Sequence, residues 1–193
     1  MATDNSALNN PPRVLVPLAQ GCEELEAVTI TDLLTRAGVN VISVGLDDNI
    51  VFASRGMKLV PDKLLDDVLD EDFDMIVLPG GLPGADHLNN DPRIQLLVKK
   101  MAANNKYTAA ICAAPRVLAT AGILEGKHAT SFPGALDNFP VNELVYEEKA
   151  VVVDGKVVTS RGPGTAMDFT LTLIELLSGK TKRQEVEAQL QRQ

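Results

Sequence analysis

Short apolar runs alternate along this chain with segments in which apolar residues recur every three or four positions. The runs have the length of buried strands and cover residues 13–18, 39–46, 107–112 and 74–81, the last running into a glycine loop. The segments with helical spacing cover residues 23–38, 91–105, 114–122 and 165–179. Strands that are apolar on both faces are typical of a parallel sheet covered by helices, so the pattern predicts an α/β fold with a mostly parallel sheet.

Residue types at the segment ends support these helices. Gly38 and Gly122 follow the last apolar positions of two segments, and helices commonly end on such a glycine. Asp91 precedes Pro92, and an N-capping aspartate followed by proline predicts a helix that begins at residue 92.

Four further segments are expected at the edges of this fold. Residues 49–62 predict a hairpin that turns near Arg55–Gly56, and residues 149–160 predict a hairpin with a type I′ turn at Asp154–Gly155. Residues 64–73 predict a short helix, and the polar residues 180–193 predict a frayed helix that covers little of the core.

The composition fits one folded domain. The chain has 193 residues, of which 45% are hydrophobic, and we expect a disordered tail over residues 1–12 and a single domain over residues 13–193. The net charge of −8, with no cluster of lysines and arginines, argues against binding to nucleic acids or membranes. The chain has no signal-peptide pattern and only two cysteines, which predicts a cytoplasmic protein with free thiols.

Four loops of unusual composition lie next to the predicted strands. They read "AQGCEE", "PGGLPGAD", "CAAPR" and "SRGPGT" and begin at residues 19, 79, 112 and 160. Ligands of parallel sheets bind beyond the carboxyl ends of the strands, so we expect these loops to meet at one edge of the sheet.

Cys112 lies among small residues where a predicted strand meets a predicted helix. This is the pattern of a nucleophile elbow, a turn so crowded that its neighbours must be small. The free N–H groups of a helix N-terminus favour negative charge, so we expect the Cys112 pKa to lie below that of a free thiol. The alternative is that Cys112 is only a small buried hydrophobic residue.

The glycine loop at residues 78–86 suggests a partner for this thiol. It lacks the Gly-Lys-Ser/Thr of a phosphate-binding loop and the three glycines of a dinucleotide site. Gly80 and Gly81 allow a backbone N–H to face Cys112 instead, with the amide of Cys112 or Ala113 as the other half of an oxyanion site. The alternative is an ordinary tight turn between a strand and a helix.

Glu26 shares a helical stripe with core positions Ile30, Leu33 and Ala37. A carboxyl group buried there would have a raised pKa, and could donate a hydrogen bond to the sulfur or take a proton from a substrate. The alternative is an acidic residue that only complements the helix dipole, a role for which Glu23 and Glu24 are better suited.

The stretches "GCEELEAV", "LPGG", "AAICAAP" and "TSRGPGT" occur in the order and spacing of the ThiJ/PfpI superfamily. The chain resembles this family over nearly all residues after 12, and most resembles the branch of the Parkinson disease protein 7 and its bacterial relatives. The resemblance implies a flavodoxin-like three-layer α/β/α sandwich, of the class I glutamine amidotransferase type, that forms a homodimer and needs no cofactor or metal.

The resemblance also implies roles for individual residues. Cys112 matches the reactive, oxidation-prone cysteine of the family, Glu26 the protonated glutamate that hydrogen-bonds it, and Gly81 an amide donor beside the thiol. Two further groups are implied near the site: arginines close to the dimer interface, Arg36 and Arg55, and a wall formed by Ser160, Gly162 and Pro163.

One position departs from the family pattern. Family members often have a histidine where this chain has Phe132. His87 and His128 are expected to be structural or solvated, which weakens any Cys-His-acid triad. Cys22 could pair with an oxidised Cys112, although a passive role is the simpler expectation.

Two functions share this predicted site. The first is an enzyme that acts without glutathione on methylglyoxal, glyoxal and their adducts on proteins (a glyoxalase or deglycase), with Cys112 as nucleophile and Glu26 as proton shuttle. The second is a redox chaperone that senses oxidative stress through oxidation of Cys112. A cysteine peptidase lacks the expected histidine, and a glutamine amidotransferase would need a histidine after residue 128, where the sequence has none.

Overall fold

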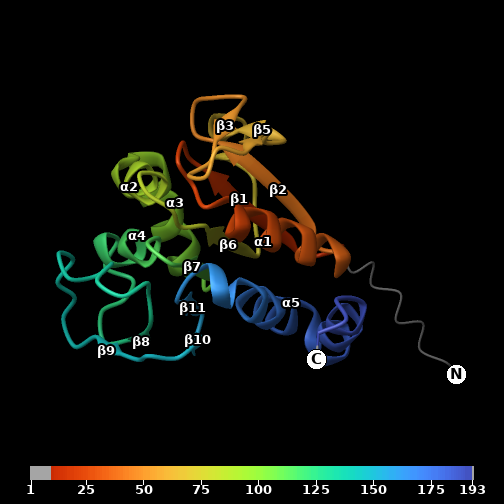
Figure 1. Cartoon of the computed structure of the whole chain (residues 1–193). Coiled ribbons are helices and arrows are strands. Elements are labelled where there is room, and N and C mark those ends of the chain that lie inside the picture. Colours follow the sequence, from red (N-terminus) through yellow and green to blue (C-terminus); the bar gives the residue numbers. More distant parts are fainter. Residues whose placement is uncertain (1–9, 193) are drawn as a thin grey trace, which may run out of the picture.

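The computed structural model describes residues 10–192, in which one seven-stranded sheet lies between helical layers (Figure 1). The strands of this sheet are β1 (Arg13–Leu18), β2 (Asn40–Gly45), β5 (Lys63–Leu64), β6 (Met75–Leu78), β7 (Tyr107–Ile111), β10 (Val151–Asp154) and β11 (Val157–Ser160). Their order across the sheet is β10-β11-β7-β6-β1-β2-β5, and only β10 runs antiparallel to its neighbour.

The five longer parallel strands confirm the predicted fold class. Numbered in chain order, β2, β1, β6, β7 and β11 have the spatial order 2-1-3-4-5, which is the flavodoxin-like arrangement. The chain reverses its direction of winding at β1 and β6, so the loops after these two strands diverge and leave room for a site at that edge.

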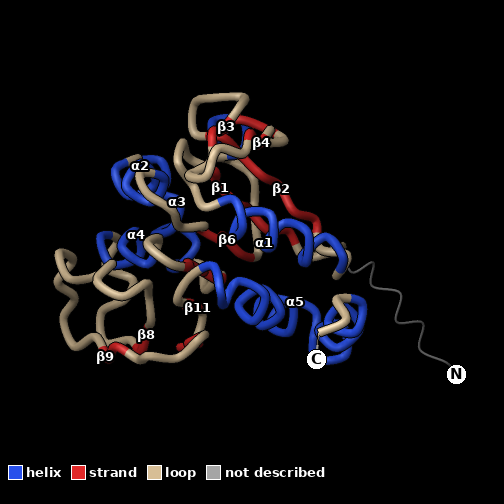
Figure 2. Tube along the Cα trace, in the orientation of Figure 1, coloured by secondary structure: helices blue, strands red, loops and turns tan. Residues whose placement is uncertain are grey.

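Helices cover both faces of the sheet, as Figures 1 and 2 show. The helices are α1 (Glu24–Arg36), α2 (Gly84–Asn90), α3 (Pro92–Ala103), α4 (Pro115–Thr120) and α5 (Ala166–Gln189). Alternate residues of β1 point to opposite layers: Val14 and Val16 pack with α1 and α5, whereas Leu15 packs with α3 and α4. Each layer therefore has its own apolar core, as the fully apolar strands predicted.

Two small sheets lie beside the main one. The predicted hairpin at residues 49–62 contains the antiparallel strands β3 (Val51–Phe52) and β4 (Lys58–Leu59). Strands β8 (His128–Ala129) and β9 (Val145–Tyr146) form a parallel pair that the sequence did not predict. Short 3-10 turns cover Leu65–Val68 and Pro163–Thr165.

The prediction of a helix over residues 64–73 is wrong. The segment begins with β5 and continues as a single 3-10 turn, in which a carboxylate oxygen of Asp67 accepts a hydrogen bond of 3.2 Å from the Leu64 N–H. This bond caps the start of the turn, but Asp66, Asp67 and Asp70 are weak helix formers, and the segment does not continue as a regular helix. The segment predicted as a glycine loop, residues 78–86, contains the start of a helix that was not predicted, because α2 begins at Gly84.

Two features of the C-terminal half also differ from expectation. The turn between β10 and β11 consists of Gly155 and Lys156 rather than Asp154–Gly155, and of these two only Gly155 has a positive φ (+61°), so the turn is not type I′. Helix α5 extends to Gln189 across a break at Gly179, and Val186 beyond the break is fully buried. The C-terminal segment therefore contributes to the core.

The tail predicted over residues 1–12 falls mostly on residues 1–9, which lie outside the described residues, as does residue 193. The Pro12 carbonyl accepts a hydrogen bond of 2.9 Å from the Asn40 N–H, so the described part of that segment is joined to the main fold. Between residues 10 and 192, no helix combines the length and apolar character that crossing a bilayer requires.

Candidate active site

Cys112 occupies a strained turn between β7 and α4. Its φ is +62°, which is uncommon for a residue with a side chain and is the backbone signature of a nucleophile elbow. The turn is fixed on both sides, because the Cys112 N–H donates to the Ser160 carbonyl (3.0 Å) and the Cys112 carbonyl accepts from the Phe132 N–H (2.8 Å). The thiol is 8% exposed and opens on a pocket.

The glycine loop packs directly against this turn. A Cβ atom on Gly80 would lie 2.6 Å from the Cys112 Cβ, so only glycine fits at that position. The Gly81 and Ala113 N–H groups hydrogen-bond the Cys112 sulfur, and each lowers the Cys112 pKa. Both residues of the predicted oxyanion site thus lie beside the thiol.

Gly81 should be far less tolerant of substitution than a glycine of positive φ that has open space around it, such as Gly38. The φ of Gly81 is +87°, and an added Cβ would lie 2.3 Å from the backbone nitrogen of Glu23. We expect Gly81→Ala to lower the free energy of unfolding by about 3 kcal/mol or more, because the clash adds to the backbone strain. Urea denaturation measures this loss.

Gly38 provides the matched control. Its φ is +78°, but an added Cβ would meet no atom within 4 Å. Gly38→Ala should therefore cost only the backbone strain, about 1–2 kcal/mol. Equal losses for the two variants would contradict the close packing of the glycine loop on the first helix.

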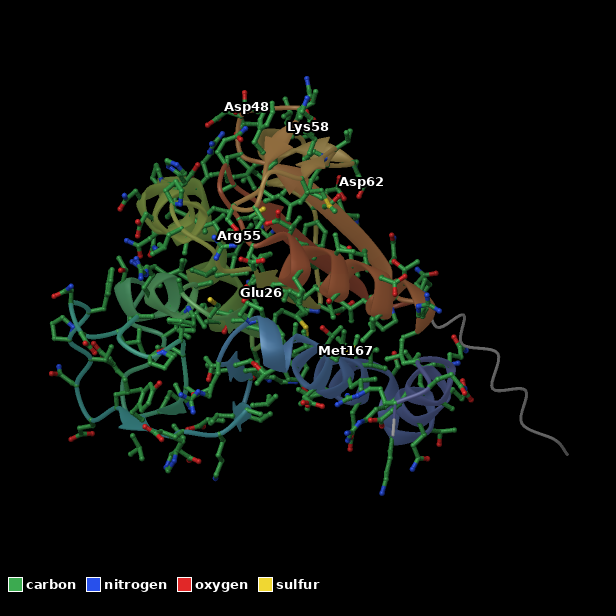
Figure 3. The ribbon with its side chains drawn as sticks, viewed as in Figure 1. Glu26, Asp48, Arg55, Lys58, Asp62 and Met167 are labelled. Atoms are coloured by element: carbon green, nitrogen blue, oxygen red, sulfur yellow. The ribbon has the colours of Figure 1, made fainter. Side chains whose placement is uncertain are left out.

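Glu26 comes from the first turns of α1 and is fully buried (Figure 3). Its Oε2 accepts a hydrogen bond of 2.8 Å from the Gly80 N–H, whereas its Oε1 has no hydrogen-bond partner among the residues that the structure describes. Burial raises the Glu26 pKa from the ordinary 4.5 to about 7. Helix position, burial and pKa therefore agree with the prediction of an unusual carboxyl group.

The prediction of a lowered pKa is wrong for the Cys112 thiol taken alone. Burial and, second, the negative charge of Glu26 raise the Cys112 pKa to about 12. The small-residue pattern predicted the turn but carried no information on this desolvation, which opposes the charged form of any buried thiol.

The two groups must be considered as one pair. Their side chains interact, so the pKa values of about 7 and about 12 belong to the pair, which holds one proton and one negative charge between them. A charged sulfur has two amide donors besides the Glu26 proton, whereas a charged Glu26 has one amide donor, the Gly80 N–H, and the weak S–H donor of Cys112. Because a buried charge is costly where its donors are few and weak, this arrangement favours the proton on Glu26 and the charge on Cys112.

Glu26→Gln should change how stability depends on pH. Unfolded, Glu26 loses its proton near its ordinary pKa of 4.5, whereas the folded pair loses its first proton only near pH 7, so stability that is fully present below pH 4.5 is lost as the pH rises through about 7. Glutamine does not titrate. Between pH 4.5 and pH 8, the free energy of unfolding of the variant should therefore rise by about 3 kcal/mol relative to that of wild type. Urea denaturation at both pH values measures the difference, and a difference that is independent of pH would contradict the raised pKa.

A cavity of about 490 Å³ lies in front of the thiol. The predicted site residues that line it are Cys112, Gly81, Ala113, Arg55 and Pro163. A Cβ on Gly162 would lie 4.0 Å from the Cys112 sulfur, so Gly162 keeps this space open. Two predicted residues, Ser160 and Gly80, do not line the cavity. The Ser160 side chain is buried and donates a hydrogen bond to the Ala150 carbonyl (2.7 Å).

Several residues of the cavity were not predicted as site residues. Arg116 comes from the first turn of α4, where its guanidinium is paired with Asp86. Phe132 lies in the loop between β8 and β9, and the sequence singled it out only as a departure from the family pattern. The others are Glu23, Ser54, Leu82, Pro133, Gly134 and Ala135.

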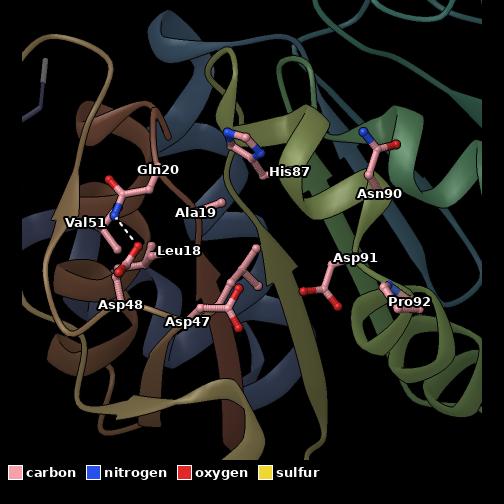
Figure 4. Close-up of a pocket in the computed structure, with 11 residues that line it drawn as sticks. Leu18, Ala19, Gln20, Asp47, Asp48, Val51, His87, Asn90, Asp91 and Pro92 are labelled. Atoms are coloured by element: carbon pink, nitrogen blue, oxygen red, sulfur yellow. Dashed lines mark hydrogen bonds between the residues drawn. The ribbon is translucent and has the colours of Figure 1, made fainter.

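The remaining residues singled out by the sequence lie away from the thiol cavity. His87 lines a separate cavity of about 340 Å³ with Asp47, Asp48 and Asp91 (Figure 4), and the exposed His128 interacts with Glu147. Arg36 pairs with Asp32 one turn earlier on α1. Cys22 is fully buried, and burial raises its pKa to about 12.

Comparison with known proteins places this site in context. Residues 12–176 match the model of the DJ-1/PfpI family. The chain is 45% identical over 175 residues to the Protein DJ-1 homolog A of Arabidopsis thaliana, covering 90% of this chain and 45% of that protein. It thus spans less than half of the length of this plant relative and of its homolog B.

Other relatives match over almost their whole length. The Parkinson disease protein 7 homolog of Danio rerio is 40% identical over 181 residues (92% of this chain, 96% of that protein). The glutathione-independent glyoxalase DJR-1.2 of Caenorhabditis elegans is 36% identical over 182 residues (94% of each).

Solved structures agree with the fold. The crystal structure of Drosophila melanogaster DJ-1beta superposes with a TM-score of 0.89 at 40% identity, covering 94% of this chain and 98% of that one. Oxidized DJ-1 of Toxoplasma gondii superposes with a TM-score of 0.87 at 42% identity, covering 93% and 97%.

Proposed function

The chain belongs to the DJ-1/PfpI family, as its motifs predicted, and from that premise we propose that it converts reactive dicarbonyls to hydroxy acids without glutathione. Its substrates would be methylglyoxal, glyoxal and their adducts on amines and thiols. The observation that carries the proposal is the elbow at Cys112, with φ of +62°, against buried Glu26. The name of the Caenorhabditis elegans relative, a glutathione-independent glyoxalase, supports it.

The reaction needs only the thiol, the carboxyl group and water. The Cys112 thiolate attacks the aldehyde carbon and the carbonyl oxygen takes the proton that Glu26 held, while the Gly81 and Ala113 amides stabilise negative charge. Glu26 removes the proton from that carbon and returns one to the adjacent ketone carbon, so the first carbon is oxidised to a thioester and the second is reduced to an alcohol. Water then cleaves the thioester, which releases lactate from methylglyoxal and restores the thiol.

The proposal also concerns partners and compartment. Apolar side chains that are about half exposed gather on α1 and on the β3–β4 hairpin: Leu25, Val28, Phe52 and Met57. We expect this face, with Arg36 nearby, to bury itself in a homodimer, in line with the family resemblance. The free thiols of Cys22 and Cys112 suit the reducing cytoplasm.

Lactate formation tests the proposed function directly. The purified chain is incubated with methylglyoxal in glutathione-free buffer made with D₂O, and the lactate is measured by mass spectrometry. We expect lactate with deuterium at C2, because the proton carried by Glu26 exchanges with solvent. Lactate at no more than the rate without protein would refute the proposal.

A second candidate function uses the same site. Cys112 would be oxidised by peroxide to the sulfinic acid, held by the Gly81 and Ala113 amides, and so would act as a sensor of a redox-regulated chaperone. The oxidized Toxoplasma gondii relative favours this candidate. Intact-mass measurement after peroxide treatment should show two added oxygens on Cys112, and a thiol inert to peroxide would exclude it.

A cysteine peptidase is the least supported candidate. Such an enzyme needs a general base beside the thiol, usually a histidine. Both histidines of the chain lie in the described part, and neither lines the Cys112 cavity.

A further inference from the structure

Phe132 is tied to the nucleophile through the backbone. Its N–H donates the hydrogen bond of 2.8 Å to the Cys112 carbonyl, and its own carbonyl accepts from the Ala135 N–H (2.9 Å). The position of residue 132 is therefore fixed relative to the elbow, even though it lies in a loop between two short strands.

The side chain of Phe132 borders the same space as the sulfur. A Cβ atom on Gly162 would lie 3.4 Å from Cδ2 of Phe132 and 4.0 Å from the sulfur of Cys112. The ring and the thiol thus both border the space beside Gly162. Phe132 is 50% exposed and lines the cavity, so part of its side chain is free to contact a ligand.

The rest of the wall is mainly apolar on this side of the cavity. Leu82, Pro133, Ala135 and Pro163 line it with Phe132. The cationic groups of the lining do not compete for an apolar substituent, because the Arg55 side chain is 79% exposed and the Arg116 side chain is paired with Asp86. The cavity of about 490 Å³ is of a size that holds much larger ligands than methylglyoxal.

We propose that Phe132 is a specificity-determining residue that selects dicarbonyls with an apolar, preferably aromatic, substituent. This inference rests on the proposed function, whose chemistry is unchanged: an arylglyoxal would give a thiohemiacetal, then a thioester, and with water a 2-hydroxy-2-arylacetate. The aromatic substituent stacks on the exposed face of Phe132, while the dicarbonyl carbons lie at the sulfur.

The test compares phenylglyoxal with methylglyoxal as substrates. We expect wild type to prefer phenylglyoxal by about 10-fold or more in kcat/KM, which is the discrimination that an apolar pocket provides. Phe132→Ala should lower this preference about 10-fold while changing kcat/KM for methylglyoxal less than about threefold. Phe132→His keeps a flat ring but makes it polar. Its preference for phenylglyoxal should lie between those of wild type and Phe132→Ala.

Matched controls make the comparison specific. Leu96 on α3 is 70% exposed and does not line the cavity, so Leu96→Ala should keep the wild-type preference. Because phenylglyoxal also modifies arginine, initial rates are used and intact mass is checked. Equal preference in wild type and Phe132→Ala would overturn the inference.

A second measurement separates this inference from the proposed function. Iodoacetamide and N-benzyliodoacetamide both alkylate Cys112 with loss of iodide, and their rate ratio reports binding of the benzyl group without any turnover. Phe132→Ala should lower the ratio of benzyl to parent reagent about 10-fold. If neither dicarbonyl is turned over, the proposed function fails, and an unchanged alkylation ratio would then overturn the role of Phe132 as well.

Discussion

Replacing Cys112 with serine should lower kcat/KM for glutathione-independent conversion of methylglyoxal by about 10³-fold or more. The serine hydroxyl is a much weaker nucleophile near neutral pH, and no histidine lines the cavity to activate it. The elbow itself would remain, because its hydrogen bonds to Ser160 and Phe132 are made by the backbone. The loss should therefore come from chemistry and not from unfolding.

The chain offers a matched control in its second cysteine. Cys22 is also buried, but its thiol does not line the cavity. Cys22→Ala should keep kcat/KM within about twofold of wild type, since it removes no group from the reaction. Lactate is measured for both variants after circular dichroism has confirmed that each is folded. Undiminished lactate formation by Cys112→Ser would refute the assignment of the nucleophile.

The backbone of this site could be predicted largely from sequence. Small residues around Cys112 indicated a crowded strand-to-helix turn, and its positive φ confirms that the turn is strained. Helical spacing placed Glu26 on the buried stripe of α1, and the structure buries it completely. Hydrophobic periodicity and runs of small residues reflect local steric requirements, so they indicate where a tight turn lies and which face of a helix is buried.

Other features depend on contacts that no local pattern encodes. Phe132 is placed at the Cys112 cavity by the loop between β8 and β9, two short strands whose pairing no local pattern predicted. Helix α2 was hidden because Gly84, Asn89 and Asn90 are weak helix formers, whereas the packing of Ala85 and Leu88 in the core stabilises it. The raised pKa of Cys112 follows mainly from desolvation, which only the assembled fold sets.

Glu26→Gln should lower kcat for the dicarbonyl reaction by about 10²–10⁴-fold, the usual contribution of a positioned acid–base group. Glutamine still accepts the Gly80 hydrogen bond through its amide oxygen, so the loop beside the thiol should keep its position. What the variant loses is the proton transfer between the two substrate carbons. Pre-steady-state kinetics should accordingly show formation of the cysteine adduct without lactate release.

The pH dependence of Cys112 alkylation decides where the shared charge resides. If Glu26 holds the proton, the thiolate appears with the first titration of the pair, and the alkylation rate by iodoacetamide should rise with a midpoint near pH 7 in wild type. In Glu26→Gln the acid proton is absent and only the weaker amide donor remains beside the sulfur, so the midpoint should move to higher pH. A wild-type midpoint above pH 9 that falls in Glu26→Gln would show the opposite: the charge would reside on Glu26, and its repulsion would hold the thiol protonated. The proposed attack would then require Glu26 to take the thiol proton as the sulfur attacks, so the resting pair would hold no thiolate at neutral pH.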